Sequence, residues 1–320
     1  MSNPALPQKI LVTGATSMLG RFLLPRLLDA DYEVHAISRA PSENPNMTNI
    51  NTTDKKMFWH QADISHPEQL PHINAQAVIH LAPLWLLPSV LPVVNALGIK
   101  RVIGFGSTSL FSKANSPDAG ERHLAARFAA VEEAISRFCG PLKIKWTVFR
   151  PTLVYDCVQD KNITLIAHFI QRFGFFPLVG EAAGLRQPVY ADDLAMACLM
   201  ALNKRTTFYK AYNMSGGETL SYREMVERIF GSLDKRARFL IIPGWLFRWA
   251  IRIIMLFPGT RHMNPEMAIR MNIDLCFDHA DAMQDFGFSP RLFLPSWQAV
   301  HAHTSGSIRC NDRSAAEQKL

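Results

Sequence analysis

The segment from Lys9 to Gly20 constrains the fold of this chain more than any other stretch of its sequence. Residues 10–12 form a short apolar run that predicts a buried strand, and the apolar spacing over 18–28 predicts a helix. Gly14 allows a sharp turn between them, and Gly20 allows the helix to pack closely on the strand. The N–H groups that begin such a helix bind phosphate, so we expect a pyrophosphate-binding cradle here. Its candidate residues are Gly14, Thr16, Ser17, Met18, Leu19 and Gly20.

The spacing of Gly14, Ser17 and Gly20 is that of a G-x-x-G-x-x-G cradle with serine at its centre. Such a pattern is weak evidence on its own, because many kinds of loop contain it by chance. A strand precedes it here and a helix follows it. That context favours a dinucleotide site over the alternative, a structural turn in another α/β protein.

Five further apolar segments predict strands, and helical patterns lie between them, notably over 119–138. The predicted strands cover 32–37, 57–62, 77–82, 101–106 and 146–149. Strands that alternate with helices imply a parallel sheet covered on both faces, the doubly wound α/β class. Ligands of such sheets bind beyond the carboxyl ends of the strands, so we expect the residues there to form one site. They are Gly14, Arg39, Asp63, Ala82, Ser107 and Thr152.

The second predicted strand ends at Ser38 and Arg39, which bears on the choice of cofactor. A dinucleotide site that prefers NAD usually places Asp or Glu here, where the carboxylate binds the ribose 2′-hydroxyl. An arginine favours a 2′-phosphate instead, and Ser38 could add a hydrogen bond, so we predict NADP in preference to NAD. The alternative is that Arg39 is a solvent-exposed loop charge.

The composition limits the other classes of function. Apolar residues make up 48% of the chain and charged residues 19%, as in folded soluble proteins. The net charge of +7 comes without a long Lys/Arg run, so we predict no nucleic-acid binding. The five scattered cysteines predict reduced thiols and no metal site. Residues 1–8 are too short and polar for a secretory leader, so we expect a cytoplasmic protein.

Seven motifs follow one another along nearly the whole chain. They are TGATSMLG (13–20), ADI (62–64), IHLA (79–82), FGSTS (105–109), FRPTLVY (149–155), RQPVYADDLA (186–195) and AYNMSGGETLSYREM (211–225). This ordered set resembles the extended short-chain dehydrogenase/reductase family, in its nucleotide-sugar epimerase and dehydratase branch. The resemblance implies a Rossmann domain over 1–155, completed by parts of 186–216, and a smaller interleaved substrate lobe over 156–302. We expect the polar tail over 303–320 to be disordered.

The resemblance also implies places for the cofactor and the substrate. By this resemblance, Asp63 and Ile64 would flank the adenine, and Leu81 and Ala82 would line the cofactor. Pro151 and Thr152 would lie near the nicotinamide, and Arg186, Tyr190 and Asp192 would lie on the substrate side. The implied activity is that of an NAD(P)-dependent oxidoreductase or epimerase. Its implied substrate is a nucleotide sugar or a related carbonyl or alcohol.

The chain departs from this family at the catalytic pair. Members carry Tyr-x-x-x-Lys on the helix after the fifth strand, whereas the helix here, GERHLAARFAAVEEAI, has neither residue. Ser107 or Thr108 fills the hydroxyl position of the family, and His123 with Arg127 has the spacing of the missing pair. A histidine can exchange protons near neutral pH and an arginine could hold a ribose. The alternative is that His123 and Arg127 are exposed positions on an ordinary helix.

The missing pair motivates a second hypothesis, a catalytically silent NADP-binding regulatory or assembly factor. Residues 239–257 are the most hydrophobic stretch, but Pro243 and Gly244 interrupt it, and the remainder is too short to span a membrane. Its basic and tryptophan-rich part, 245–257, could lie on a membrane surface, contact a protein or close the substrate lobe. The family implies a dimer, but the altered helices leave the oligomeric state open.

Three local patterns complete the analysis. Ser221 and Glu224 predict a capping box at the start of a helix over 222–230. Asp192 and Asp193 suit the first turn of a helix, which alone could explain both carboxylates. The aromatic and basic segment 169–177 could line a substrate pocket or simply pack within the lobe.

Overall fold

The computed structural model describes residues 8–39, 56–244, 246–247 and 270–295 of the 320-residue chain. Its contacts divide the chain into two compact units. Unit 1 comprises Met1–Val154, Gln187–Thr219 and Leu275–Leu292, and unit 2 comprises Tyr155–Arg186, Leu220–Asp274 and Phe293–Leu320. Most of the predicted interfacial segment, Trp245 and 248–257, and the whole predicted tail from 303 onward lie outside the described residues. The predictions for them stay predictions.

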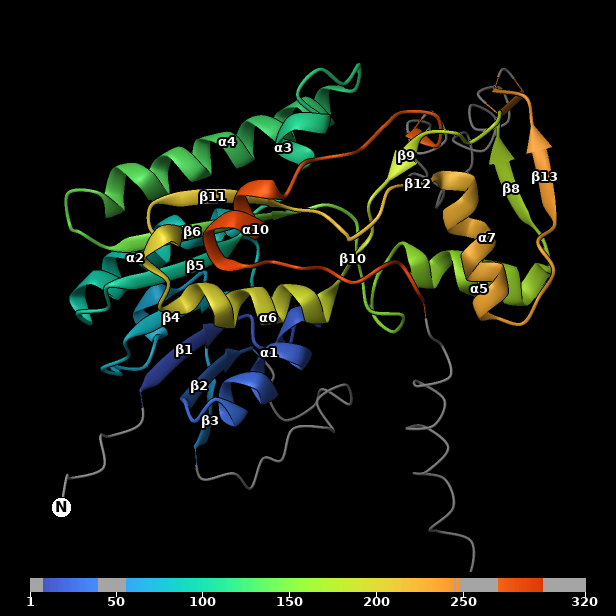
Figure 1. Ribbon diagram of the computed structural model, residues 1–320. Helices are drawn as coiled ribbons and strands as arrows, with labels where there is room; N and C mark the ends of the chain where they lie inside the picture. Colours follow the sequence, from blue (N-terminus) through green and yellow to red (C-terminus); the bar gives the residue numbers. More distant parts are fainter. Residues whose placement is uncertain (1–7, 40–55, 245, 248–269, 296–320) are drawn as a thin grey trace, which may run out of the picture. The chain divides into compact units, whose positions relative to one another are not determined.

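A seven-stranded sheet forms the centre of unit 1 (Figure 1). Its strands are β1 (Lys9–Thr13), β2 (Glu33–Ser38), β3 (Met57–Gln61), β4 (Ala77–His80), β5 (Arg101–Phe105), β6 (Lys145–Pro151) and β11 (Lys210–Met214). The spatial order is β11-β6-β5-β4-β1-β2-β3, and every neighbouring pair is parallel. The predicted doubly wound α/β class is therefore confirmed, with six strands at the predicted apolar runs.

The order of strands in space reverses at β1. The chain builds β2 and β3 on one side of β1 and then crosses over to build β4, β5 and β6 on the other. Thr13, the last residue of β1, is level with His80 at the end of β4 and with Ile37 in β2. The turns that follow these strands therefore meet at one edge of the sheet, where parallel sheets of this kind bind ligands.

Helices cover both faces of this sheet (Figure 1). Their bounds are α1 (Met18–Asp29), α2 (Leu87–Ala96), α4 (Ala119–Cys139), α6 (Ala191–Leu202) and α10 (Ala280–Phe286). Side chains of α1, α6 and α10 share one core cluster with Ile10 and Val12, whereas α2 and α4 share the other with Leu11. Successive strand residues point to opposite faces, so β1 contributes to both cores.

Shorter elements connect these layers. They are η2 (Pro67–Gln69), η3 (Leu84–Leu86), α3 (Ser109–Ser112), β10 (Val189–Tyr190), η4 (Arg205–Thr207) and β7 (Val154–Tyr155), where the chain passes from unit 1 to unit 2. Asp192 and Asp193 lie in the first turn of α6, as their charge predicted.

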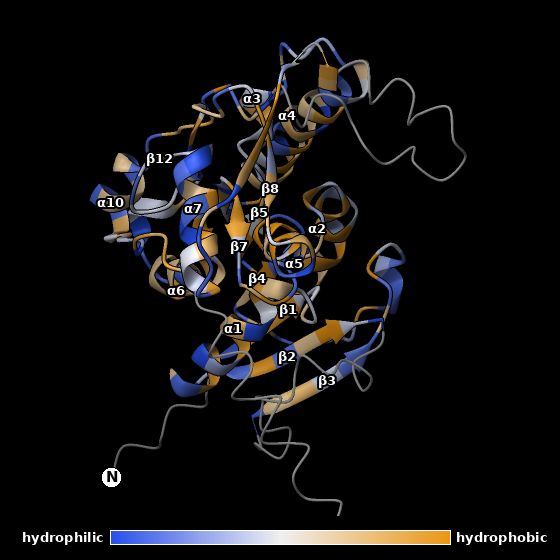
Figure 2. Ribbon diagram, turned by 90° about the vertical axis from the view of Figure 1, so that its right-hand side faces the viewer, coloured by the Kyte–Doolittle hydropathy of each residue, from blue (hydrophilic) through white to orange (hydrophobic). Residues whose placement is uncertain are grey.

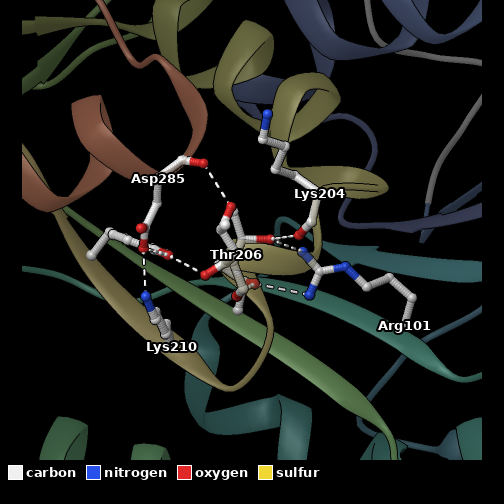
Figure 3. Close-up of polar contacts among 8 residues, drawn as sticks. Arg101, Lys204, Thr206, Lys210 and Asp285 are labelled. Carbon is white, nitrogen blue, oxygen red and sulfur yellow. Dashed lines mark hydrogen bonds and ion pairs between the residues drawn. The ribbon is translucent and has the colours of Figure 1, made fainter.

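A buried arginine holds the opposite, amino-terminal edge of the sheet (Figure 3). Arg101, the first residue of β5, donates from Nε to the Leu202 carbonyl at 3.0 Å and from Nη2 to the Ala201 carbonyl at 2.9 Å. These bonds satisfy carbonyls at the end of α6. Its Nη1 donates to Thr147 Oγ1 at 2.8 Å and to the Lys145 carbonyl at 3.1 Å. Burial lowers the pKa of Arg101 to about 10, which leaves it charged at neutral pH.

The same edge is joined to the last helix of unit 1 through Asp285 (Figure 3). Its carboxylate accepts hydrogen bonds from the Tyr212 hydroxyl and from Lys210 Nζ, both at 2.6 Å. Its carbonyl accepts from Thr206 Oγ1 at 2.6 Å. These contacts tie α10 to β11 and η4, although 73 residues separate Asp285 from Tyr212.

In its described part, unit 2 includes the helices α5 and α7 and two small sheets. Its elements are α5 (Ile163–Phe173), β8 (Phe176–Val179), β9 (Leu185–Arg186), β12 (Leu220–Ser221), α7 (Tyr222–Ser232) and β13 (Phe239–Ile242). Strands β8 and β13 are parallel, and β9 and β12 are antiparallel. Ser221 and Glu224 cap α7 reciprocally, which confirms the predicted capping box. Figure 2 shows hydrophilic colour on α7, whose apolar residues are buried. None of the helices in the described ranges is long and apolar enough to cross a membrane.

Candidate functional site

The turns after β1, β2, β3 and β4 surround a cavity of about 420 Å³ at the carboxyl edge of the unit 1 sheet. This volume is within the usual range for small-molecule sites. Nine of the predicted cofactor residues line it: Gly14, Thr16, Ser17, Ser38, Arg39, Asp63, Ile64, Leu81 and Ala82. Met18, Leu19, Gly20, Pro151 and Thr152 do not line it, although the first three begin α1 directly beside it.

Two glycines give the cradle its shape. Gly14 has φ +68°, and a Cβ there would lie 2.6 Å from the backbone nitrogen of Ala82. A Cβ on Gly20 would lie 1.9 Å from the Ala15 carbonyl oxygen, so the first turn of α1 can pack this closely only without a side chain. Ser17 is the N-cap of α1, and its hydroxyl accepts a hydrogen bond from the Gly20 N–H at 3.3 Å. The serine at the centre of the cradle thus has a clear local role.

A buried histidine lies beneath the cavity and connects two of its turns. His80 Nδ1 and Thr13 Oγ1 are 2.8 Å apart, and His80 Nε2 lies 3.2 Å from the Pro83 carbonyl. Burial lowers the pKa of His80 to about 4, so the ring is neutral at physiological pH. A neutral ring that donates from Nε2 to Pro83 accepts at Nδ1 from Thr13, which satisfies both nitrogens.

The rim of the cavity between β2 and β3 carries its charged groups. Arg39 is exposed, and its carbonyl accepts a hydrogen bond from Gln61 Nε2 at 3.0 Å. Ser38 is buried, with its hydroxyl 3.1 Å from Thr16 Oγ1. Asp63 accepts from the Ser65 hydroxyl at 2.6 Å and from the Ser65 N–H at 2.9 Å. These bonds hold the pKa of Asp63 below its ordinary value.

These groups fit a dinucleotide phosphate. The absence of a side chain at Gly14 lets the turn after β1 pack against the Ala82 backbone, and the amino end of α1 adds a positive dipole end. Arg39 adds a cation at the end of β2, where a ribose 2′-substituent would lie. Asp63 and Ile64, after the neighbouring strand β3, also line the cavity.

The two candidate hydroxyls after β5 have different environments. Thr108 is buried, and its Oγ1 donates to the Pro151 carbonyl at 3.1 Å. Ser107 is half-buried, and its Oγ accepts from the Ser109 N–H at 3.1 Å, which leaves its own proton to donate. Thr152 Oγ1 donates to the Gln187 carbonyl. None of these three hydroxyls lines the cavity, and a role for Ser107 toward a substrate stays a prediction.

The proposed substitute for the catalytic pair lies on α4. His123 and Arg127 are both exposed and one helical turn apart. The Arg127 guanidinium lies 4.3 Å above the centre of the Trp85 ring, in a cation–π contact. Neither residue lines the cavity. The arginine therefore has a packing partner, and a role for His123 in proton exchange stays a prediction.

Of the three predicted substrate-side residues, Arg186 belongs to unit 2. It is 4% exposed and donates to the carbonyls of Leu185 and Ile273, both at 2.7 Å, and to that of Arg270. Its guanidinium also lies over the Tyr222 ring. In this arrangement Arg186 satisfies backbone carbonyls within unit 2.

Tyr190 and Asp192 belong to unit 1, at the start of α6. Asp192 accepts two bonds from Arg26 of α1, at 2.6 and 2.7 Å, and one from Arg291 at 3.0 Å. Burial opposes ionisation, but these two arginines keep the pKa of Asp192 below its ordinary value. The Tyr190 ring contacts Phe22 edge-on and lies under the Arg291 guanidinium. Both residues join α6 to α1, and their predicted role toward a substrate stays a prediction.

Five lining residues were absent from the sequence-based prediction: Ile37, Ala62, Ser65, Pro83 and Leu86. Four of them adjoin a predicted residue at a strand end, so extending each strand-end site by one to two residues would have found them. Leu86 belongs to η3, a turn that the apolar sequence did not indicate. Within the described ranges, no three His, Cys, Asp or Glu side chains are grouped so that they could hold a metal.

The sequence matches one protein-family model and several individual proteins. Residues 10–85, which include the cradle and its cavity, match the NAD dependent epimerase/dehydratase family. The 2-alkyl-3-oxoalkanoate reductase of Stenotrophomonas maltophilia is 23% identical over 328 residues, which cover 89% of this chain and 96% of that protein.

Solved structures match over most of the chain. The UDP-glucose 4-epimerase of Thermotoga maritima with UDP-glucose has a TM-score of 0.65 at 17% identity and covers 89% of this chain and 94% of that one. The dTDP-glucose 4,6-dehydratase of Bacillus anthracis in complex with NAD has a TM-score of 0.66 at 16% identity, with 89% and 92% covered. The fold is therefore the Rossmann-type fold of sugar epimerases and dehydratases.

Proposed function

We propose that this chain, which resembles the extended short-chain dehydrogenase/reductase family and matches its NAD dependent epimerase/dehydratase branch over residues 10–85, is an NADP-binding oxidoreductase or epimerase. The observation that carries the proposal is the cavity at the strand ends. It combines a backbone cradle that excludes a Cβ at Gly14 with a cation at Arg39. The cradle suits the pyrophosphate of a dinucleotide, and the cation suits the 2′-phosphate of NADP.

The choice of NADP rests on the end of β2. The exposed Arg39 lines the cavity at the position where NAD-preferring sites place a carboxylate. A guanidinium can bind a 2′-phosphate through charge-assisted hydrogen bonds. Asp63, at the end of the neighbouring strand β3, accepts both Ser65 bonds at Oδ1, and Arg39 is one of the charges that lower its pKa.

The substrate class is a nucleotide sugar or a related carbonyl or alcohol. The bound cofactor would supply hydride transfer at its nicotinamide. On the protein side, the Ser107 hydroxyl would donate a hydrogen bond to the substrate oxygen, since Thr108 already donates to Pro151. His123 is the candidate for proton exchange with that oxygen. UDP-glucose, bound in the structure of the Thermotoga maritima epimerase, and a 2-alkyl-3-oxoalkanoate, named for the Stenotrophomonas maltophilia reductase, are the first compounds to test.

The test begins with calorimetric titration of NADPH and NADH into the wild type, Arg39→Ala and a control, Lys143→Ala, which removes an exposed charge elsewhere in unit 1. We expect NADPH to bind more tightly than NADH. Arg39→Ala should weaken NADPH at least about tenfold, or about 1.4 kcal/mol, and leave NADH nearly unchanged. The absence of binding by either cofactor would overturn the proposal.

The second stage measures turnover with UDP-glucose and with a 2-alkyl-3-oxo acid. Ser107→Ala should lower kcat more than about tenfold without weakening NADPH binding, because the hydroxyl contacts the substrate alone. The comparisons do not favour a catalytically silent factor. Tight NADPH binding without hydride transfer to any compound of these classes would nevertheless support that alternative.

A further inference from the structure

Unit 2 carries an apolar and basic surface that the proposed function does not use. Phe173 at the end of α5 is 51% exposed, and Leu240 of β13 is 52% exposed. Monomeric soluble proteins rarely leave large apolar side chains grouped in this way without a partner. The question is whether these two residues belong to one surface and what would cover it.

Strand register places Leu240 on a continuous sheet face. Leu240 pairs with Pro177, so both side chains point to the same face of the β8–β13 sheet. Phe175 and Arg238 share that face by alternation. The other face carries Leu178, which is fully buried in unit 2. That other face also carries Ile241, which is 58% exposed, so β13 exposes apolar side chains on both faces of the small sheet, and Leu240 is the one that shares a face with Pro177.

Ring contacts connect this sheet face to the end of α5. Phe173 lies 4.6 Å from Phe169 and 6.4 Å from Phe175, measured between ring centres. The Arg172 guanidinium lies 5.4 Å from the centre of the Phe173 ring. We name these residues the apolar–basic patch: Arg172, Phe173, Phe175, Pro177, Arg238 and Leu240.

The segment that leads into β13 follows the same end of α5. Lys235 Nζ lies 3.2 Å from the Gln171 carbonyl and 3.4 Å from that of Ile170, where it can donate to both. Arg236 and Arg238 are exposed, so two further cations adjoin the exposed apolar side chains. The backbone carbonyl of Arg238 accepts from the Phe176 N–H at 2.9 Å, which fixes this segment beside β8.

The two segments that form the patch carry cations only, between the exposed carboxylates Glu181 and Asp234 that flank them. The sequence has no Asp or Glu from 161 to 180, and none from 235 to 265, a stretch that contains six Lys or Arg residues. An anionic leaflet attracts cations that surround an apolar centre. The chain also continues from β13 into the tryptophan- and arginine-rich segment 245–257.

We propose that the apolar–basic patch binds the surface of an anionic phospholipid bilayer, without crossing it. Phe173 and Leu240 would enter the boundary between headgroups and acyl chains. Arg172, Arg236 and Arg238 would meet lipid phosphates, in the manner of interfacial proteins. This proposal does not depend on the cofactor or on catalysis.

The test is flotation of the full-length protein with vesicles of phosphatidylcholine, with and without phosphatidylglycerol. We expect binding only to the anionic vesicles, and weaker binding as salt increases. The double variant Arg236→Gln/Arg238→Gln should bind at least about tenfold more weakly. Its matched control, Lys100→Gln/Lys143→Gln, removes the same charge from exposed sites of unit 1 and should bind like the wild type.

The apolar half of the patch is tested separately with Leu240→Gln. Met283→Gln is its control, because Met283 is 55% exposed on α10 of unit 1. Leu240→Gln should reduce vesicle binding several-fold, while the control and the melting temperatures stay unchanged. No flotation with anionic vesicles, or equal flotation of patch variants and controls, would overturn the proposal. So would a concentration-dependent dimer in sedimentation that the patch variants dissociate, because the occupant would then be a second copy.

Discussion

The two edges of the unit 1 sheet handle polar groups in opposite ways. At the amino-terminal edge, Arg101 is 5% exposed, and its nitrogens donate to protein oxygens (Figure 3). At the carboxyl edge, Arg39 is exposed, and the turn at Gly14 faces a cavity. One arginine is bonded within the fold, and the other is the proposed binding group for a cofactor phosphate. In this sheet, a polar side chain whose donors are bonded to protein oxygens is therefore structural, whereas one that faces a cavity is a candidate binding group.

The largest expected effect comes from breaking the saturated edge. Arg101→Met would leave the carbonyls of Leu202 and Lys145 buried without this donor. Each such group costs about 1–3 kcal/mol, and part is regained because no charge is desolvated, so we expect a loss of about 3 kcal/mol in the free energy of unfolding. Urea unfolding measures it. NADPH affinity of the folded protein should not change, and Lys100→Met, an exposed neighbour, should have little effect. A loss of NADPH affinity in Arg101→Met would contradict the separation of the two edges.

The next effect is the acid sensitivity of the turn beneath the cavity. The pKa of His80 falls from 6.5 in the unfolded chain to about 4 in the folded protein. Protonation of His80 therefore favours the unfolded chain. Above pH 6.5 protonation of this residue has no effect on the free energy of unfolding, and the free energy of unfolding decreases as the pH falls from 6.5 to 4. The full loss is about 3 kcal/mol, at about 1.4 kcal/mol per pKa unit.

Urea unfolding at several pH values compares the wild type with His80→Gln. The variant should be less stable at neutral pH but should lose less of its stability toward pH 4. His60, whose pKa is also lowered by burial and by His35, is present in both proteins, so the difference isolates His80. Parallel pH profiles of the two proteins would contradict the assignment.

A third substitution adds a side chain to the turn that forms the cradle. Gly14→Ala places a methyl group 2.6 Å from the Ala82 nitrogen and strains a φ of +68°. We expect a loss of about 2 kcal/mol in stability and at least a tenfold loss of NADPH affinity, read by titration. Gly98→Ala is the control, because Gly98 has φ +72° and nothing within 4 Å of the added Cβ. Gly98→Ala should therefore lose stability through backbone strain but keep the NADPH affinity of the wild type. Equal effects on NADPH binding would show that strain alone, and not the cradle, matters.

The smallest expected effect comes from removing a single hydroxyl group, that of Ser17. Ser17→Ala removes the N-cap of α1 and should cost about 1 kcal/mol of stability. Ser221→Ala removes the equivalent cap of α7 in unit 2 and should cost a similar amount. Only the first should also weaken NADPH, because Ser17 lines the cavity. A weakening by both variants would mean that NADPH affinity reports general stability.

The sequence predicted what is local and failed where contacts are distant. Apolar runs located six strands, and the glycine spacing located the cradle, because both patterns lie within a few residues of each other. Nothing near Arg101 indicates its burial, since its partners other than the Val102 carbonyl are 44 to 106 residues away along the chain. In the sequence, an arginine at the start of a strand suggests that the strand begins at the protein surface.

The same limit applies to the candidate site. Arg39 and Asp63 could be placed at the cavity because strand ends of a parallel sheet converge by rule. The partners of Arg186 and Asp192 follow no such rule, and only the folded chain shows that backbone carbonyls and two arginines already engage them. His80 was visible as the one polar residue of its strand, but its link from Thr13 to Pro83 was not.

The return of residues 275–292 to unit 1 has a consequence for synthesis on the ribosome. Phe286 and Phe288 are buried in the core of unit 1, and Asp285 anchors Lys210 and Tyr212. The core around the first strands of the sheet therefore cannot be completed until almost the whole chain has left the ribosome. The segment of unit 2 from Leu220 to Asp274 is translated in the meantime, while one side of β11 still lacks its cover. A chain that stopped before residue 275 would have every strand of the central sheet and still leave this apolar surface open to aggregation.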